Sequence, residues 1–128
     1  MANPNIVNVA TISGGSLGYH LTTVATTALM TVTSGGIIKI NSILVANVDG
    51  TNAATVDVRI VKLNVTPPGI TNFDTSGTFY LAKTVNVPAD DILVIIDKPI
   101  YIMETDVLQG SASVASDLDL LVSYEVIS

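Results

Sequence analysis

The sequence contains a single histidine, His20, with hydroxyl groups close to it at Ser13 and Ser16. A serine activated by a histidine and an aspartate is the nucleophile of many hydrolases. No G-x-S-x-G pattern encloses a serine here, and the glycines of "SGGSLG" (13–18) lack the strand–turn–helix context of a dinucleotide-binding loop. We therefore interpret 13–18 as a flexible turn and His20 as a surface or strand-edge residue.

Acidic side chains occur in pairs that offer oxygen ligands to a hard cation. The groups are Asp90 with Asp91, Glu104 with Asp106, Asp117 with Asp119, and Asp49 with Asn52 and Asp57. None has the spacing of an EF-hand loop, and each lies at or beside a predicted turn, where Asp bonds its own backbone. Glycoside hydrolysis would also need aromatic platforms, and the chain has two Phe, four Tyr and no Trp. We assign no catalytic, cofactor-binding or metal-binding residue and expect a protein that is not an enzyme.

Composition excludes several further classes of function. Five Lys and Arg stand against eleven Asp and Glu, for a net charge of −6, so nucleic acid and anionic membranes are not expected partners. The chain has no cysteine for a disulfide or a thiolate site. It also shows no apolar run near the length of a membrane span and no recognisable secretory signal. We expect a globular protein that matures in a cytoplasm.

Alternation of apolar and polar residues with a period of two recurs along the chain, and helical periodicity does not. Strands are predicted near 6–9, at 20–33 as one bent or two short strands, and at 36–48, 55–63, 78–87, 92–97, 100–103, 107–114 and 118–127. The segment 64–77, with two prolines and two glycines, is the clearest loop. This pattern predicts an all-β chain: one antiparallel β-sandwich domain over 1–128, jelly-roll-like, with eight or nine strands. Residues 1–12 form either an N-terminal arm or the first strand, and a closed barrel is the alternative to two facing sheets.

The segment from Ile43 to Leu63 predicts two strands joined by a turn at Asp49 and Gly50. The face expected in the core carries Ile38, Ile40, Leu44, Ala46 and Val48, and the second face carries Ile43, Val45, Asn47, Thr55 and Val61. Because this second face has so few charges, we expect it to cover a neighbouring sheet or to contact another subunit. We expect Arg59, near Asp57 and Lys62, to make ordinary cross-strand pairs.

Only 12% of the residues are charged, while 48% are hydrophobic. An exterior of Thr, Ser, Asn, Ala and aliphatic groups is poorly protected against association, but it suits a protein that assembles through broad contacts. The composition therefore favours a structural or interaction protein over an enzyme.

Three segments carry a resemblance to a known family. They are "ANPNIVNV" (2–9), "NVDGTNAA" (47–54) and "DLLVSYEVIS" (119–128). Together with the intervening sequence, they resemble a family of short virion structural proteins from tailed phages of aquatic bacteria, including cyanophages. The resemblance implies a β-rich protein that is present in many copies in the particle and has no enzymatic activity.

Within a virion we expect a capsid decoration or cement protein on the exterior of the head. The expected partners are the major capsid protein and copies of the chain itself, with a trimer as one arrangement. A tail or neck component is the alternative in the same class. A carbohydrate-binding jelly roll of a receptor-binding apparatus, or a small hydrolase, would belong to other classes.

Overall fold

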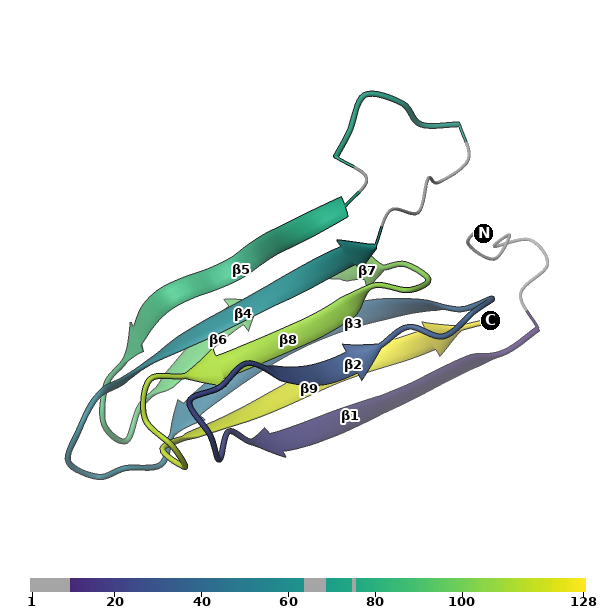
Figure 1. The fold of residues 1–128 in the computed structure, drawn as a ribbon. Coiled ribbons are helices and arrows are strands. Elements are labelled where there is room, and N and C mark those ends of the chain that lie inside the picture. The colour runs from purple at the N-terminus through teal and green to yellow at the C-terminus, as the bar shows by residue number, and fades with distance from the viewer. Residues whose placement is uncertain (1–9, 64–68, 75) are drawn as a thin grey trace.

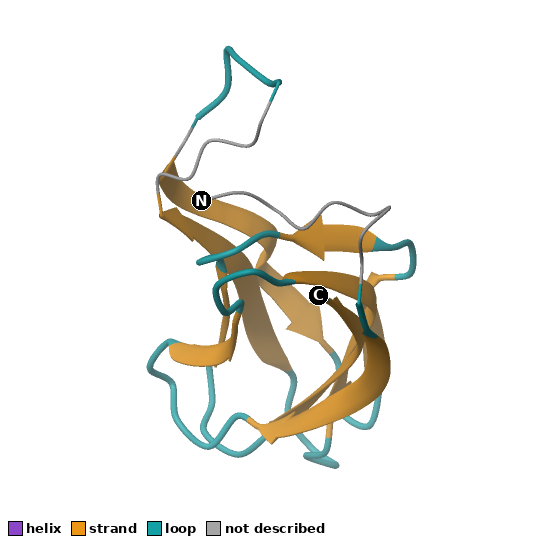
Figure 2. Cartoon of the chain, turned by 90° about the vertical axis from the view of Figure 1, so that its right-hand side faces the viewer, coloured by secondary structure: helices purple, strands orange, loops and turns teal. Residues whose placement is uncertain are grey.

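A computed structural model describes residues 10–63, 69–74 and 76–128. These residues form nine strands, and they include no helix that could cross a membrane (Figures 1 and 2). The strands are β1 (Ile12–His20), β2 (Thr27–Thr31), β3 (Ile37–Asn47), β4 (Ala54–Leu63), β5 (Ser76–Val87), β6 (Ile92–Ile96), β7 (Ile100–Ile102), β8 (Val107–Ala112) and β9 (Leu118–Ile127).

The strands form two antiparallel sheets that face each other (Figure 1). Sheet A has the order β1-β9-β3-β6, with β7 beside β6 on the same edge of β3, and sheet B has the order β2-β8-β4-β5. The chain passes from one sheet to the other at nearly every connection, and its last strand lies between its first and third. This interleaving is the topology of a jelly roll. The predicted all-β sandwich with eight or nine strands is therefore confirmed.

The core lies between the two sheets and takes alternate residues from each strand. On β4, Val56, Val58 and Ile60 point inward, as the alternation predicts. On β9, three fully buried aliphatic residues follow the same period: Leu118, Leu120 and Val122. Each such side chain contributes about 1.5–3 kcal/mol when it is removed from water.

The predicted hairpin between Ile43 and Leu63 is wrong. Strand β3 belongs to sheet A and β4 to sheet B, so the turn at Asp49 and Gly50 connects two sheets instead of two paired strands. Gly50 does not adopt the positive φ of a tight hairpin turn. The connection is held by Asn47, a 4% exposed amide that donates to the carbonyl oxygens of Asn52 and Val87 and accepts from the Asp49 N–H.

The predicted faces of β3 are correct only for its first half. Ile38 and Ile40 are buried, but the pairing of β3 with β9 then shifts, and Asn41 is the extra residue of a β-bulge. An extra residue exchanges the two faces of a strand. Beyond it, residues of the second face are in the core, namely Ile43, Val45 and Asn47, and residues predicted for the core point outward, namely Leu44, Ala46 and Val48.

The predicted flexible turn at 13–18 is also wrong, because these residues lie in β1. Nine successive pairs join β1 to β9 without a register shift. Gly15 is opposite Tyr124, and a Cβ on Gly15 would lie 2.9 Å from the Tyr124 hydroxyl oxygen. The small residues of β1 therefore make room for an aromatic ring of the neighbouring strand.

The remaining boundaries differ little from prediction. The segment 20–33 holds the end of β1 and a separate short strand, β2, and β5 begins at Ser76, just before the predicted position. Residues 69–74 form no strand, in agreement with the predicted loop. The predicted strand near 6–9, most of the N-terminal arm and the rest of that loop lie outside the described residues.

Candidate functional site

The outer face of sheet A carries two rows of side chains that run straight across the sheet. Backbone pairing aligns Gly18, Leu121, Leu44 and Val94 in one row, and His20, Asp119, Ala46 and Ile92 in the next. The large apolar side chains of these rows remain in contact with solvent: Leu121 is 45% exposed, Val94 51% and Ile92 55%. We call Gly18, Leu44, Ala46, Ile92, Val94 and Leu121 the sheet A patch.

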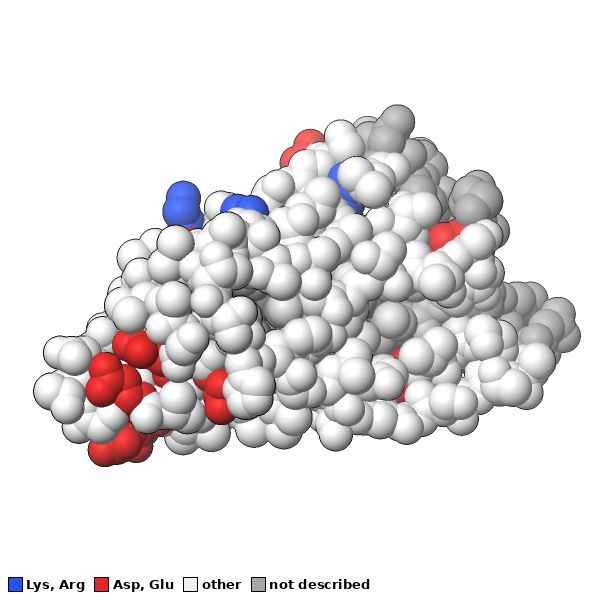
Figure 3. Space-filling model, turned by 60° about the horizontal axis from the view of Figure 1, so that its bottom comes forward, with Lys and Arg blue, Asp and Glu red and all other residues white. Residues whose placement is uncertain are grey.

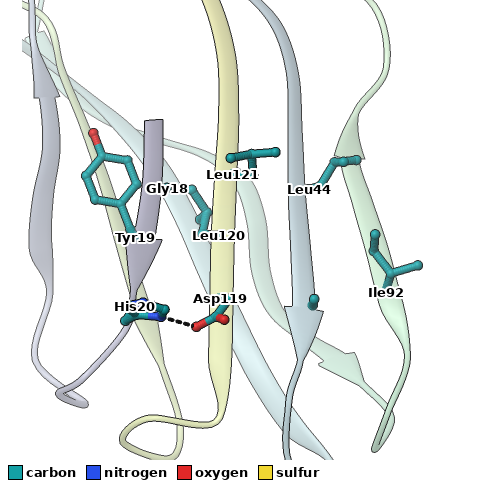
Figure 4. A pocket seen from close by; sticks show the side chains of 9 residues that line it. Gly18, Tyr19, His20, Leu44, Ile92, Asp119, Leu120 and Leu121 are labelled. Carbon is teal, nitrogen blue, oxygen red and sulfur yellow. Dashed lines mark hydrogen bonds and ion pairs between the residues drawn. The ribbon is translucent and has the colours of Figure 1, made fainter. Parts of the chain in front are cut away.

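A shallow groove of about 400 Å³ follows these rows. Its lining comes from β1, β9, β3 and β6: Gly18, Tyr19, His20, Leu44, Ala46, Ile92, Asp119, Leu120 and Leu121 (Figure 4). Leu44 and Ala46 reach this face because of the bulge at Asn41. Apart from one hydrogen-bonded polar pair at its end, the groove offers mainly apolar surface, which suits contact with another apolar surface.

The polar pair joins His20 at the end of β1 to Asp119 of β9 (Figure 4). His20 Nδ1 lies 2.6 Å from Asp119 Oδ1, and the two side chains are 81% and 39% exposed. Ser16, on the same face of β1, is four residues away, about 13 Å along the strand. The serine–histidine arrangement of a hydrolase is therefore not formed, and His20 is the strand-edge residue that was predicted.

Acidic groups gather at the end of the molecule that holds the β3–β4, β5–β6 and β8–β9 connections (Figure 3). The backbones of the β3–β4, β5–β6 and β8–β9 connections are joined there through Asp49, Asp90, Asp91 and Asp117. Asp49 accepts hydrogen bonds from the Thr51 N–H and the Asn52 amide, and these bonds lower the pKa of Asp49. No group of three or more potential metal ligands occurs among the described residues. Asp49 thus stabilises a turn, as predicted.

The other predicted acidic pair, Glu104 and Asp106, is buried in the β7–β8 connection, and each residue is 2% exposed. Glu104 accepts a hydrogen bond from the Gly35 N–H at 3.0 Å. Asp106 accepts one from the Met103 N–H at 2.8 Å and pairs with Lys62 Nζ at 2.7 Å. These carboxylates hold two connections in place.

Arg59 makes the cross-strand contacts that were expected of it, on the outer face of sheet B. Its guanidinium donates to Gln109 Oε1, to the Tyr80 hydroxyl and to Thr26 Oγ1, at 2.8–3.0 Å. Lys83 Nζ lies 5.0 Å from the centre of the Tyr80 ring. All three nitrogens of Arg59 are therefore engaged, two by neighbouring strands of sheet B and one by Thr26 just before β2.

The sheet A patch was missed by sequence reasoning because the alternation of apolar residues was continued straight through 41 and 42. The signal that could have located it is the polar pair Asn41-Ser42, which interrupts an otherwise apolar strand. On β4, by contrast, Thr55 and Val61 lie on the outer side, as predicted for the second face, and are partly buried.

No protein-family model matches the chain, and no curated protein matches it in sequence. Among solved structures, the VP2 subviral particle of infectious bursal disease virus is similar, with 10% sequence identity and a TM-score of 0.40. The alignment covers 93% of this chain and 33% of the VP2 chain, so the chain spans about a third of that protein's length. A likeness this distant says nothing of function.

Proposed function

We propose that the protein is a non-enzymatic structural component of a phage virion that decorates the exterior of the mature head. The observation that carries the proposal is the sheet A patch, a grooved apolar surface that spans four strands and that none of the described residues covers. The sequence resemblance to small phage virion proteins supports the same class. In this role the patch contacts the major capsid protein at a junction between coat subunits.

In this role the protein stabilises the capsid by binding alone, without a catalysed reaction. A protein that binds the mature arrangement of coat subunits more tightly than the dissociated subunits stabilises that arrangement by mass action. The patch suits such binding because its apolar side chains can be removed from water with little desolvation of charge. The net charge of −6 agrees with a position outside the shell, away from packaged DNA.

The test uses phage particles that lack the protein, to which purified protein is added. We expect the wild-type protein to bind in hundreds of copies and to raise the temperature at which the particles release DNA. Leu121→Asp should weaken binding by about a hundredfold or more, because it places a charge in the apolar centre of the contact. Binding is measured by co-sedimentation, and DNA release by dye fluorescence during heating.

Leu63→Asp is the matched control, since Leu63 is 55% exposed on sheet B and the same charge is introduced there. It should bind and protect like the wild type. Particles without the protein that resist heat and infect as well as complete ones would contradict the cement role. A handful of copies per particle would instead favour the tail or neck, and retention on host polysaccharide would favour a glycan-binding protein.

A further inference from the structure

No other strand of the described residues pairs with the outer edge of β1, and the hydrogen-bonding groups of this edge can be assigned residue by residue. Thr11 and Ser128 exchange two backbone hydrogen bonds, and Leu21 N–H donates to the Leu118 carbonyl. Because an antiparallel ladder alternates, the odd-numbered residues of β1 bond to β9. The even-numbered ones turn their N–H and C=O groups to the free edge: Ile12, Gly14, Ser16, Gly18 and His20.

This edge lacks the devices with which proteins protect strand edges from pairing. The nine residues of β1 include no Lys and no Pro, and its pairing with β9 has no bulge. The other edges are protected. Strand β2 has five residues and a bulge, and β5 has two register shifts and carries Lys83. On the third edge, β6 has a register shift and β7 has three residues.

The sequence of β1 is complementary to itself. An antiparallel pairing centred on Ser16 places Ser16 opposite its own copy, Gly14 opposite Gly18 and Ile12 opposite His20. The N–H and C=O groups of Gly14, Ser16 and Gly18 then all find partners, whereas the His20 C=O already accepts a hydrogen bond from the Thr22 N–H. On the inner face, Leu17 lies opposite Gly15 and Tyr19 opposite Ser13, so each large side chain faces a small one.

Exposed aliphatic surface accompanies this edge. Ile12, at its start, is 64% exposed, and Val24, in the connection between β1 and β2, is 60% exposed. They are the two most exposed of the large hydrophobic side chains in the described residues. Isolated exposed aliphatics are ordinary, but Ile12 belongs to the unprotected edge strand itself, where pairing with another strand would cover part of its side chain.

We propose that the occupant of this edge is a second copy of the chain, so that two β1 strands pair around a two-fold axis at Ser16 and join both sheets A into one continuous sheet. A closed, isologous dimer of this kind uses the same surface twice and leaves no further edge of β1 open. It replaces the trimer that the sequence suggested. Both sheet A patches would then face the same side of the dimer, and only their joint use on a capsid rests on the proposed virion role.

The test measures the mass of the purified full-length protein by sedimentation at concentrations up to about 100 μM. We expect a species of twice the 13.3 kDa chain mass. Ser16→Pro should weaken the dimer by about tenfold or more, since it removes the N–H at the two-fold axis. Ser16→Lys should also weaken it, because two like charges would lie directly opposite each other.

Two control variants distinguish an effect on the β1 edge from a general effect of the substitution. Ser16→Ala keeps the N–H and should dimerise like the wild type. Ser123→Lys places the same charge on the same face, but on the interior strand β9, and should dimerise as well. Circular dichroism verifies that each variant is folded, and Ser16→Lys keeps the test valid if Ser16→Pro does not fold.

Amide hydrogen exchange gives a second measurement within β1. In the dimer, the amides of Ile12, Gly14, Ser16, Gly18 and His20 should become protected, whereas those of the odd-numbered residues are protected in either state. Three results would overturn the inference. The protein could be a monomer or trimer at all concentrations, or its dimer could be insensitive to both Ser16 variants. The even-numbered amides could also continue to exchange rapidly in the dimer. None of these measurements involves particle binding, so a negative result would contradict the dimer but not the proposed function.

Discussion

At the scale of single residues, acidic side chains in this protein shape the connections between the sheets. Asp91 accepts a hydrogen bond from the Ile92 N–H at the start of β6, and Asp106 accepts one from the Met103 N–H before β8. Asp106 is 2% exposed, so its pairing with Lys62 avoids an unpaired buried charge, which would be costly. These carboxylates are thus bonded to backbone N–H groups and to a lysine of the protein itself.

Asp49 gives a prediction on the dependence of stability on pH. Its pKa is lowered first by the Thr51 N–H and then by the Asn52 amide, so folding favours the charged form. A group with a depressed pKa stabilises the fold above its unfolded value, here 3.8, and loses this contribution as the pH falls through the folded pKa. Asp49→Asn should therefore lower the melting temperature at neutral pH.

The difference between the wild type and Asp49→Asn should shrink as the pH falls below 3.8. Thermal unfolding followed by circular dichroism across this range measures it. Asp97→Asn is a control, because Asp97 is exposed and has no side-chain hydrogen bond among those of the described residues. This account would be contradicted if the melting temperature of Asp49→Asn were lower than that of the wild type by the same amount at every pH.

At the scale of strands, period-two alternation was enough to locate eight of the nine described strands, and it failed where the local geometry departs from a regular ladder. Strand β1 was missed because its glycines are typical of a turn, whereas in the structure Gly15 leaves room for the Tyr124 ring of the neighbouring strand. The faces of β3 were exchanged by the bulge at Asn41. Both features depend on the strand next to them, which a single segment of sequence does not specify.

The choice of partner strands was likewise not in the local sequence. Asp49-Gly50 is typical of a hairpin, yet β3 and β4 lie in different sheets because Asn47 ties the connection to Val87 at the end of β5. The sheet A patch depends on the same facts, since its residues come from four strands that are far apart in the sequence. Its existence could be inferred from the scarcity of charge, but its position could not.

The bulge in β3 gives a prediction that compares two neighbouring residues of equal size. Ile43 is fully buried, whereas Leu44 lies on the outer face and is only partly buried. Ile43→Ala should reduce the free energy of unfolding by about 2–5 kcal/mol, because it leaves a cavity in the core. Leu44→Ala should reduce it by less than about 1 kcal/mol, because solvent already reaches that position.

Urea unfolding of the two variants measures this difference, and the slope of the transition should stay the same. A regular strand without the bulge would give the opposite order, with Leu44→Ala the more damaging change. That outcome would restore the face assignment predicted from the sequence and would remove Leu44 and Ala46 from the sheet A patch.

At the scale of the whole molecule, the order of strands makes sheet A depend on the last part of the chain. Strand β9 lies between β1 and β3, so the first strand has no neighbour until the last one is in place. Thr11 and Ser128 also bond to each other through backbone and side-chain hydroxyl groups. Contacts this distant in sequence make folding slow, on the order of milliseconds to seconds, as in other β-sandwiches.

This topology predicts that a chain ending at Asp117 does not fold. The truncation removes three side chains that are at most 1% exposed, Leu118, Leu120 and Val122, and leaves β1 unpaired. Their burial contributes about 5–9 kcal/mol, which is comparable to the entire stability of an ordinary domain.

Removal of Ser128 alone is the control, since it keeps all of β9 and should cost only about 1 kcal/mol. Circular dichroism and the dispersion of amide proton shifts distinguish the two, and a cooperative thermal transition in the chain ending at Asp117 would show that sheet A does not depend on β9.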